Sequence, residues 1–343
     1  MSLIQRENKV GMKRGSTWGT AVQPGTGNGL YVKGHTPPKG ARKLVTNEDE
    51  FGRGMASSGE VLEYEAQSGS MSLRCYWEGL EGITASLMGL YGSSVPEAGV
   101  VRHKFKMATS AASVFHTVAW DEGDEIKAVN SARIVSGTFS YADGLNLDVN
   151  YMGDKVDVQG WTAPLSVTYP SEGKGIFKLS NATVQINAVG DVDFVSNDNL
   201  HPSGIDIAIT RGFEGLAVTA GNNAIGEPVE KAAPVVEITL TFPKKETVTA
   251  AYFNAFNNRD YKKMRIKYQG DDIDGTTSKY EIQFDFPKLL IMEAPDFAQD
   301  TPLPTTIKLK VLKAEVAPAN MEGNVPFIYI QNTVGALSGY PTM

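Results

Sequence analysis

The feature that most constrains this fold is a strict alternation of apolar and polar residues, repeated along the chain. The clearest run is MSLRCYW at residues 71–77, in which every second residue is apolar. Alternation with a period of two is typical of a β-strand with one buried and one exposed face. Such strands belong to antiparallel sheets that face water on one side. Further runs of this kind occupy residues 145–151, 236–242, 280–286 and 307–311.

Helical periodicity is rare in the chain. Over Gly79–Tyr91 the leucines and isoleucine are spaced three or four residues apart, which predicts an amphipathic helix of about three turns. A second helix is predicted over Glu246–Asn257, where apolar residues recur every four positions. The fold is therefore expected to be mainly β, with these two helices.

The predicted elements repeat in the same order in the two halves of the chain. A strand, a helix, a short strand and a hairpin of long strands follow one another twice, which indicates an internal duplication. In the first half these elements are 70–77, 79–91, 103–107 and 132–152, and in the second they are 235–242, 246–257, 264–268 and 279–312.

Glycines and prolines interrupt the pattern near the middle of the chain and suggest a boundary there. We therefore expect a first domain at 1–160, a linker at 161–175 and a second domain at 176–343. Residues 24–65 lack clear periodicity, and so does the tail after Pro318. We expect both segments to contact neighbouring subunits, because long irregular segments are often functional.

The composition narrows the possible functions. The formal net charge is −7, which argues against a protein that wraps nucleic acid, because phosphate binding needs a surplus of cations. The single cysteine, Cys75, excludes a disulfide framework. The charged N-terminus does not resemble a signal peptide, and no apolar run is long enough to span a bilayer. We expect a protein that is made in the cytoplasm, stays soluble and does not enter a membrane.

No pattern of catalytic or metal-binding residues is present in the sequence. The four histidines are scattered without ligand spacing, so surface or turn positions are expected for them. Asp272, Asp274 and Glu281 partly match a calcium-binding loop, but the flanking segments are predicted strands and position one is Gly270. A polar hairpin turn explains this segment better. We therefore expect no enzyme activity, no cofactor and no metal.

The segment Gly15-Ser16-Thr17-Trp18-Gly19-Thr20-Ala21 resembles the opening of phage tail tube proteins. The similarity extends to the entry at 130–133 into the strand 134–141, to the strand 145–152 that closes with Gly-Asp-Lys, and to 286–313 in the second half. It covers nearly the whole chain, but only the motif around Trp18 is distinctive. The chain thus resembles the two-domain tail tube (major tail) proteins of phages with long non-contractile tails.

The resemblance implies a fold of two tandem tail-tube domains, each a β-sandwich or half-barrel with one helix, completed into a β-barrel ring by oligomerisation. It implies a structural virion protein whose stacked rings form the tail tube, the channel for DNA ejection into the host. The expected partners are other copies of the chain, with a trimeric pseudo-hexamer favoured over a hexamer, and the tape measure and tail terminator proteins. DNA would pass transiently, and assembly would take place in the host cytoplasm.

If the chain forms a tube, one polar strand face should line the channel. Short or acidic side chains suit such a wall, whereas the same face could also be the solvated side of a sandwich. The candidate lumen-lining residues are Ser70, Ser72, Ser136, Thr138, Ser140, Asn146, Asp148, Asn150, Glu237, Thr239 and Thr241. Arg74 is expected on the same face as the only cation. The candidate contact residues in the long loop are Lys33, Lys39, Arg42, Lys43, Glu48, Asp49, Glu50 and Arg53.

Two alternatives remain open at this point. The chain could be a β-sandwich binding module at the tail tip, which would usually expose aromatic residues. It could also be a tail-completion ring or the inner tube of a contractile tail.

Overall fold

The structure is a computed structural model that describes residues 9–38, 42–46, 59–64, 66–110, 113–141, 144–216, 225–243, 255–293 and 305–343. The fold is mainly β, as predicted. The strands of the first half are β1 (Val10–Arg14), β2 (Gly29–Leu30), β3 (Val32–Thr36), β4 (Arg42–Thr46), β5 (Gly59–Tyr64), β6 (Gln67–Arg74), β7 (Gly89–Glu97), β8 (Val100–Met107), β9 (His116–Asp121), β10 (Ile126–Tyr141), β11 (Leu145–Gly153) and β12 (Val156–Gln159). The helix α1 is Glu81–Met88.

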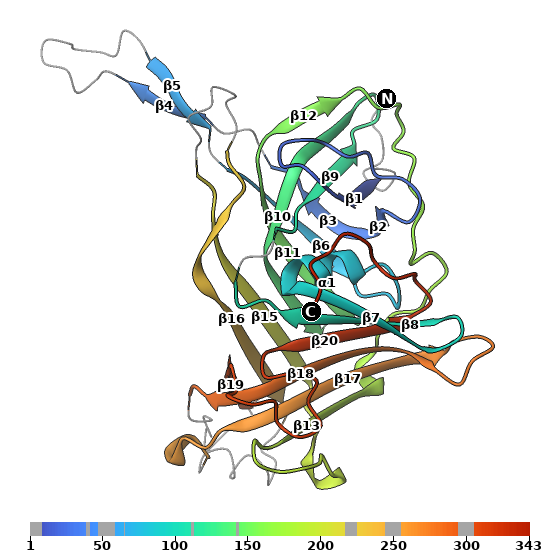
Figure 1. The fold of residues 1–343 in the computed structure, drawn as a ribbon, viewed down its shortest axis with the longest axis vertical. Helices are drawn as coiled ribbons and strands as arrows, with labels where there is room; N and C mark the ends of the chain where they lie inside the picture. Colours follow the sequence, from blue (N-terminus) through green and yellow to red (C-terminus); the bar gives the residue numbers. More distant parts are fainter. Residues whose placement is uncertain are drawn as a thin grey trace, which may run out of the picture.

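The second half continues the same antiparallel architecture. Its strands are β13 (Ala182–Ala188), β14 (Asn199–Leu200), β15 (Gly204–Glu214), β16 (Val229–Phe242), β17 (Lys262–Asp272), β18 (Lys279–Ile291), β19 (Thr305–Leu312) and β20 (Phe327–Asn332). Short 3₁₀ turns lie at η2 (Leu179–Asn181) and η3 (Ser196–Asp198). In Figure 1 the long strands β10, β15 and β16 run along the molecule, and β17, β18 and β20 cross below α1.

Strand pairing follows the same order in both halves. In the first half the order is β3-β6-β11-β10-β9-β1. In the second half it is β15-β16-β19-β18-β17-β13. The long strands β10 and β18 therefore hold equivalent places, each paired with a neighbour on both sides. The predicted repeat matches this order for β6, β10 and β11 and for β16, β18 and β19, but β17 corresponds in its pairing to β9 and not to the predicted short strand 103–107, which is β8 and pairs with β7 and β20.

The two halves join through one strand pair. Ser136–Ser140 of β10 lie antiparallel to Asp206–Thr210 of β15, so the two sets of strands form one continuous sheet. β20 adds a second link, because it lies between β18 and β8. One hydrophobic core includes residues of both halves, with the Phe139 and Phe284 rings in edge contact at 5.0 Å. The division of the chain at 161–175 stays a prediction.

The helix α1 covers the buried face of this sheet. Ile83, Leu87 and Met88 are fully buried. A Cβ added at Gly137 of β10 would lie 2.8 Å from Leu87, so the glycine lets the helix approach the strand closely. Gly89 ends the helix three residues earlier than predicted, because it takes a left-handed conformation (φ 91°) and donates to the Ala85 carbonyl.

Two expectations about irregular segments were wrong. Residues 24–65 contain β2, β3, β4 and β5, and β4 and β5 form a separate hairpin that projects from the body (Figure 1). The tail after Pro318 contains β20, whose residues are all buried in the sheet. Of the second predicted helix only residues 255–257 are described; they are helical, and the helical turn continues to residue 258.

Candidate functional site

A single polar face runs across seven strands of the continuous sheet, β3-β6-β11-β10-β15-β16-β19. Cross-strand pairs place its side chains in matched rows. One row runs Gly34, Ser72, Asp148, Thr138, Ala208, Glu237 and Lys310. The next runs Arg74, Asn146, Ser140, Asp206, Thr239 and Lys308. Because pairing in register keeps each row on one side of the sheet, these residues share a face.

All eleven lumen-lining candidates lie on this face. A third row contains Thr36, Ser70, Asn150, Ser136 and Thr210, and Thr241 pairs with Gly204 and Thr306 beyond Thr239. Asp148, Asn150 and Glu237 are exposed, whereas Asn146 is buried beneath the Lys33 amine, which donates to it at 3.2 Å. The residues that alternate with these, such as Leu73, Leu147 and Ile238, are fully buried on the opposite side.

The sequence analysis missed the central part contributed by β15. Asp206, Ala208 and Thr210 bridge the two halves of the face. The alternating pattern that predicts a half-buried strand is present in this segment, since Ile205, Ile207 and Ile209 alternate with these residues and are buried. Burial also raises the pKa of the Asp206 carboxyl above its ordinary value.

The expectation that Arg74 would be the only cation on this face was wrong. Lys308 and Lys310 lie on it because they pair with Thr239 and Glu237, and Lys33 reaches it through Asn146. Lys308 forms an ion pair with Glu293 at 3.1 Å. Among the described residues of these seven strands, the face has three carboxylates, Asp148, Asp206 and Glu237, and four cations, Lys33, Arg74, Lys308 and Lys310.

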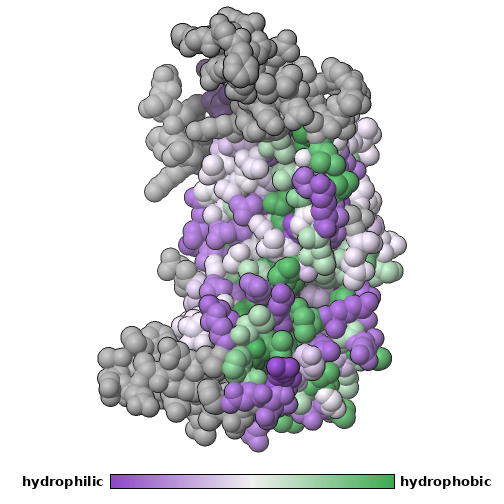
Figure 2. Space-filling view, turned by 90° about the vertical axis from the view of Figure 1, so that its left-hand side faces the viewer, coloured by the Kyte–Doolittle hydropathy of each residue, from purple (hydrophilic) through white to green (hydrophobic). Residues whose placement is uncertain are grey.

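The chemistry of the face is that of a smooth hydrophilic wall. Most of its side chains are short hydroxyls and amides, which make few fixed contacts; one is the 2.9 Å hydrogen bond between Asn150 and Ser136. Figure 2 shows the side of the molecule at the left of Figure 1, where hydrophilic and hydrophobic residues interleave without separating into blocks. A surface of this kind can lie against water or a passing polymer without holding it.

The motif around Trp18 joins distant parts of the chain. The Trp18 indole donates to the Ile225 carbonyl at 2.9 Å, and its ring contacts Phe115 edge-on at 5.4 Å. Gly19 has a φ of 82°, which favours glycine, and its N–H donates to Ser131 at 2.9 Å. The motif thus connects the N-terminal segment to β10 and to the second half of the chain.

Three of the four histidines are structural, and the expectation of surface or turn positions was wrong for two. His103 and His116 are buried, while His201 is exposed. Burial and the nearby Arg14 lower the pKa of His116 to about 3, and burial lowers that of His35 to about 4. No group of ligands that could hold a metal ion occurs among the described residues. Residues 272–279 form the β17–β18 turn, with Gly275 at φ 75°.

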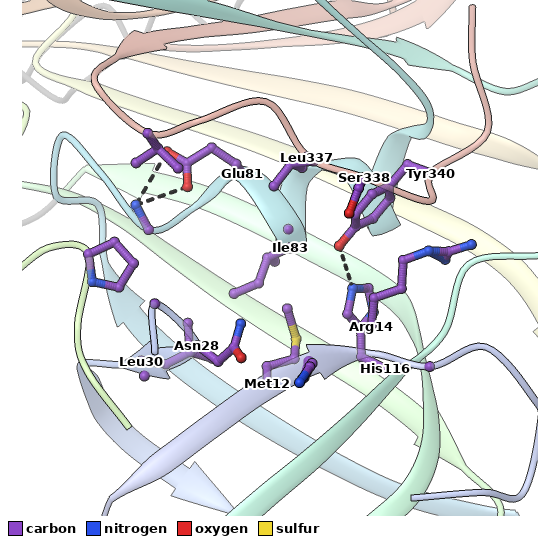
Figure 3. Close-up of a pocket in the computed structure, with 18 of the residues that line it drawn as sticks. Met12, Arg14, Asn28, Leu30, Glu81, Ile83, His116, Leu337, Ser338 and Tyr340 are labelled. Atoms are coloured by element: carbon purple, nitrogen blue, oxygen red, sulfur yellow. Dashed lines mark hydrogen bonds between the residues drawn. The ribbon is translucent and has the colours of Figure 1, made fainter. Parts of the chain in front are cut away.

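A pocket of about 430 Å³ lies between β1, α1 and the C-terminal segment (Figure 3). His116 shares a 2.8 Å hydrogen bond with the Tyr340 hydroxyl, and the Arg14 guanidinium lies over the Tyr340 ring. The residues drawn form no arrangement of nucleophile and base.

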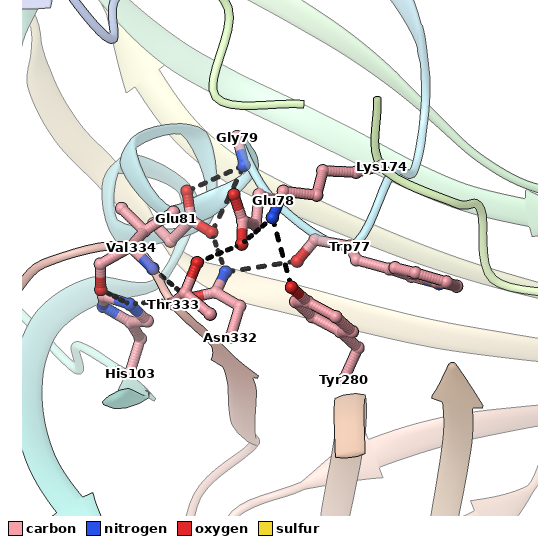
Figure 4. A network of polar contacts seen from close by, with 10 residues as sticks. All are labelled: Trp77, Glu78, Gly79, Glu81, His103, Lys174, Tyr280, Asn332, Thr333 and Val334. Atoms are coloured by element: carbon pink, nitrogen blue, oxygen red, sulfur yellow. Dashed lines mark hydrogen bonds and ion pairs between the residues drawn. The ribbon is translucent and has the colours of Figure 1, made fainter. Parts of the chain in front are cut away.

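A buried polar network holds the start of α1 against the C-terminal strand (Figure 4). Glu81 accepts hydrogen bonds from the Gly79 N–H and the Asn332 amide, and Glu78 pairs with Lys174 at 3.1 Å. Burial raises the pKa of Glu81 to about 7. The network links residues from both halves and is structural.

Of the candidate contact residues, only Lys33 has a described side chain. Arg42 and Lys43 belong to β4, for which the backbone alone is described. Lys39, Glu48, Asp49, Glu50 and Arg53 lie outside the described residues.

Comparison with known proteins identifies the family. A family model described as phage tail tube protein matches residues 5–311, which is most of the 343-residue chain. No curated protein sequence matches the chain. No helix in the described part of the chain is long and apolar enough to cross a membrane. The family match, together with the mainly β fold, shows that this chain belongs to the phage tail tube proteins.

Proposed function

We propose that this chain polymerises as stacked rings into a phage tail tube, and that its continuous polar face lines the channel through which DNA is ejected. The observation that carries the proposal is the face itself, because its rows of paired residues continue from the first half of the chain into the second. A wall must let DNA slide, and every unpaired cation would add an attraction to phosphate. Three carboxylates on the described face offset most of its four cations, and one of these cations, Lys308, is paired with Glu293 at 3.1 Å, which limits the attraction to phosphate.

The ring would contain three chains. The same pairing order occurs twice in each chain, so three copies supply six equivalent units in a pseudo-sixfold ring, which we favour over a ring of six chains. In this proposal each half is one tail-tube domain, with the boundary within 161–175. The protein acts without catalysis, cofactor or metal.

The proposed setting is the virion of a phage with a long non-contractile tail, assembled in the host cytoplasm. The tape measure protein would occupy the channel before DNA, and a tail terminator would cap the last ring. A binding module at the tail tip explains the data less well, because it would not need one polar face shared by both halves. The inner tube of a contractile tail would use the same face.

The projecting β4–β5 hairpin is proposed to contact the adjacent ring. β4 and β5 pair with each other and with no other described strand. At the base of the hairpin Thr36 and Ser70 are paired across β3 and β6, so the two chain segments that lead into the hairpin lie close together there. A short linker can therefore replace residues 42–64. The deleted protein should stay folded, with an unchanged circular dichroism spectrum, but should form single rings or monomers where the full chain forms tubes under the electron microscope. Normal tubes from the deleted protein would contradict the role of the hairpin, and the absence of tubes from the full chain would contradict the proposed function.

A further inference from the structure

The sheet that carries the polar face ends in two free edges. At one end β3 pairs with β6 but with no other described strand. At the other end β18 pairs with β19 up to Ile291, and the Met292 N–H extends this ladder by donating to the Lys308 carbonyl at 2.9 Å. On the other side of β18 the partner strand β17 starts at Lys262, opposite Leu289. No described strand therefore borders β18 at Leu290–Met292 on that side.

The junction between the halves shows how such edges combine. β15 occupies in the second half the place that β3 occupies in the first, since each is the outer neighbour of the equivalent strands β16 and β6. β10 likewise corresponds to β18. Within the chain, β10 and β15 pair over five residues, Ser136–Ser140 with Asp206–Thr210. The equivalent partner of β18 would be a strand equivalent to β15, and among the strands that the structure describes β3 is the one that holds the equivalent place.

We propose that β18 of one copy pairs antiparallel with β3 of the next copy, so that the β10–β15 junction inside each chain is repeated between chains. This inference rests on the proposed function, and it names the surfaces through which the ring closes. The two edges are different surfaces, so the contact is heterologous and must close into a ring or continue as a filament. A second copy of the chain is the only partner that supplies both edges.

The exposure of these edges supports pairing with a neighbour. Met292 is 46% exposed and Leu290 is half-buried, although both lie on the polar face of the sheet. Apolar side chains at an open edge favour association with another strand. Two of the other edge strands are poor partners, because β7 contains Pro96, which cannot donate, and β14 has only two residues.

Paired cysteines test the contact directly. The repeat allows two registers, which place Leu290 opposite Gly34 or Met292 opposite Thr36 of the next copy. We would make the double variants Leu290→Cys with Gly34→Cys and Met292→Cys with Thr36→Cys. A Cβ at Gly34 meets no atom within 4 Å, so the first variant should fold. The native Cys75 is fully buried and should not react. The control is Thr36→Cys with Ser94→Cys, which adds an exposed thiol on β7.

Mild oxidation of the assembled protein should give a ladder of disulfide-linked species on a non-reducing gel for one of the two double variants, and monomers for the control. A ladder that ends at three chains supports the trimeric ring, and one that continues to six supports a hexamer with the same contact. Monomers from both double variants, in preparations that form tubes, would overturn the proposed pairing while leaving the tube function intact. Monomers in preparations that form no tubes would overturn both the proposed strand pairing and the proposed tube function.

Discussion

Two faces of this protein are polar, and they differ in how their side chains are used. On the face across β6, β11 and β10, most side chains are short, and few contact one another. On the outward face of β8, β20, β18 and β17, long charged side chains are tied together. Arg265 and Asp285 form a two-bond ion pair at 2.7 and 2.9 Å, and Lys267 pairs with Glu281 at 2.6 Å. The first face is suited to sliding contact, whereas the second stabilises the subunit.

The difference shows most clearly in burial. Asp285 and Glu281 are buried although they belong to the outward face, because residues around Asn320 cover them and the Arg265 guanidinium donates to the Asn320 carbonyl. Asp148, in contrast, is exposed. A polar pattern in sequence therefore does not distinguish a free wall from a covered network. The side-chain contacts across the strands distinguish the two.

The two faces should differ most in how much the loss of one carboxylate lowers the free energy of unfolding. Asp285→Ala removes the carboxylate that binds Arg265 and Gln283, which leaves buried polar groups without a partner. We expect the free energy of unfolding to fall by roughly 3–5 kcal/mol. Asp148→Ala on the other face should change it by less than about 0.5 kcal/mol. Urea unfolding of both variants checks this, and equal losses would show that the two faces are energetically alike.

The next prediction concerns the buried network between α1 and β20. The pKa of Glu81 is raised from 4.5 to about 7 by burial, so the folded protein binds this proton more tightly than the unfolded chain does. Glu81 should therefore lower stability progressively as the pH rises from about 4.5 to 7. Buried His116 acts in the opposite direction below pH 6.5, because it must become charged on unfolding at low pH.

The difference between wild type and Glu81→Gln isolates the glutamate, since glutamine keeps the acceptor oxygen. Stability measured by urea unfolding across this pH range should fall less steeply with pH in the variant. Glu214→Gln, an exposed carboxylate paired with Lys231, serves as the control and should keep the wild-type slope. Identical slopes for wild type and Glu81→Gln would mean that Glu81 ionises normally in the fold.

The sequence predicted the strands that carry the polar face because one face of each is buried, which imposes alternation. It did not predict the Lys308 and Lys310 positions on that face, because register between distant strands is not visible in either strand alone. The tail strand β20 was missed for a related reason: Phe327–Ile330 are buried on both sides and therefore do not alternate. Residues 246–254 of the second predicted helix lie outside the described residues.

The last pair of substitutions should change the stability of the subunit least and should act specifically on the passage of DNA. Asp148→Lys with Glu237→Lys makes the face strongly basic, and should leave assembly largely intact while slowing DNA ejection several-fold at low salt. Added salt should restore the rate. The control is Thr183→Lys with Gln185→Lys on β13, away from this face, which adds two positive charges where the first variant adds four. Equal slowing by the control would indicate a general charge effect.

The measurement that tests the central claim most directly is a cryo-electron microscopy reconstruction of the assembled protein. The account predicts a hollow tube of stacked rings in which Ser72, Thr138, Asp148 and Thr239 face the channel, and the charged network around Asp285 lies away from it. A tube with these four residues on its outer surface would contradict the assignment of faces.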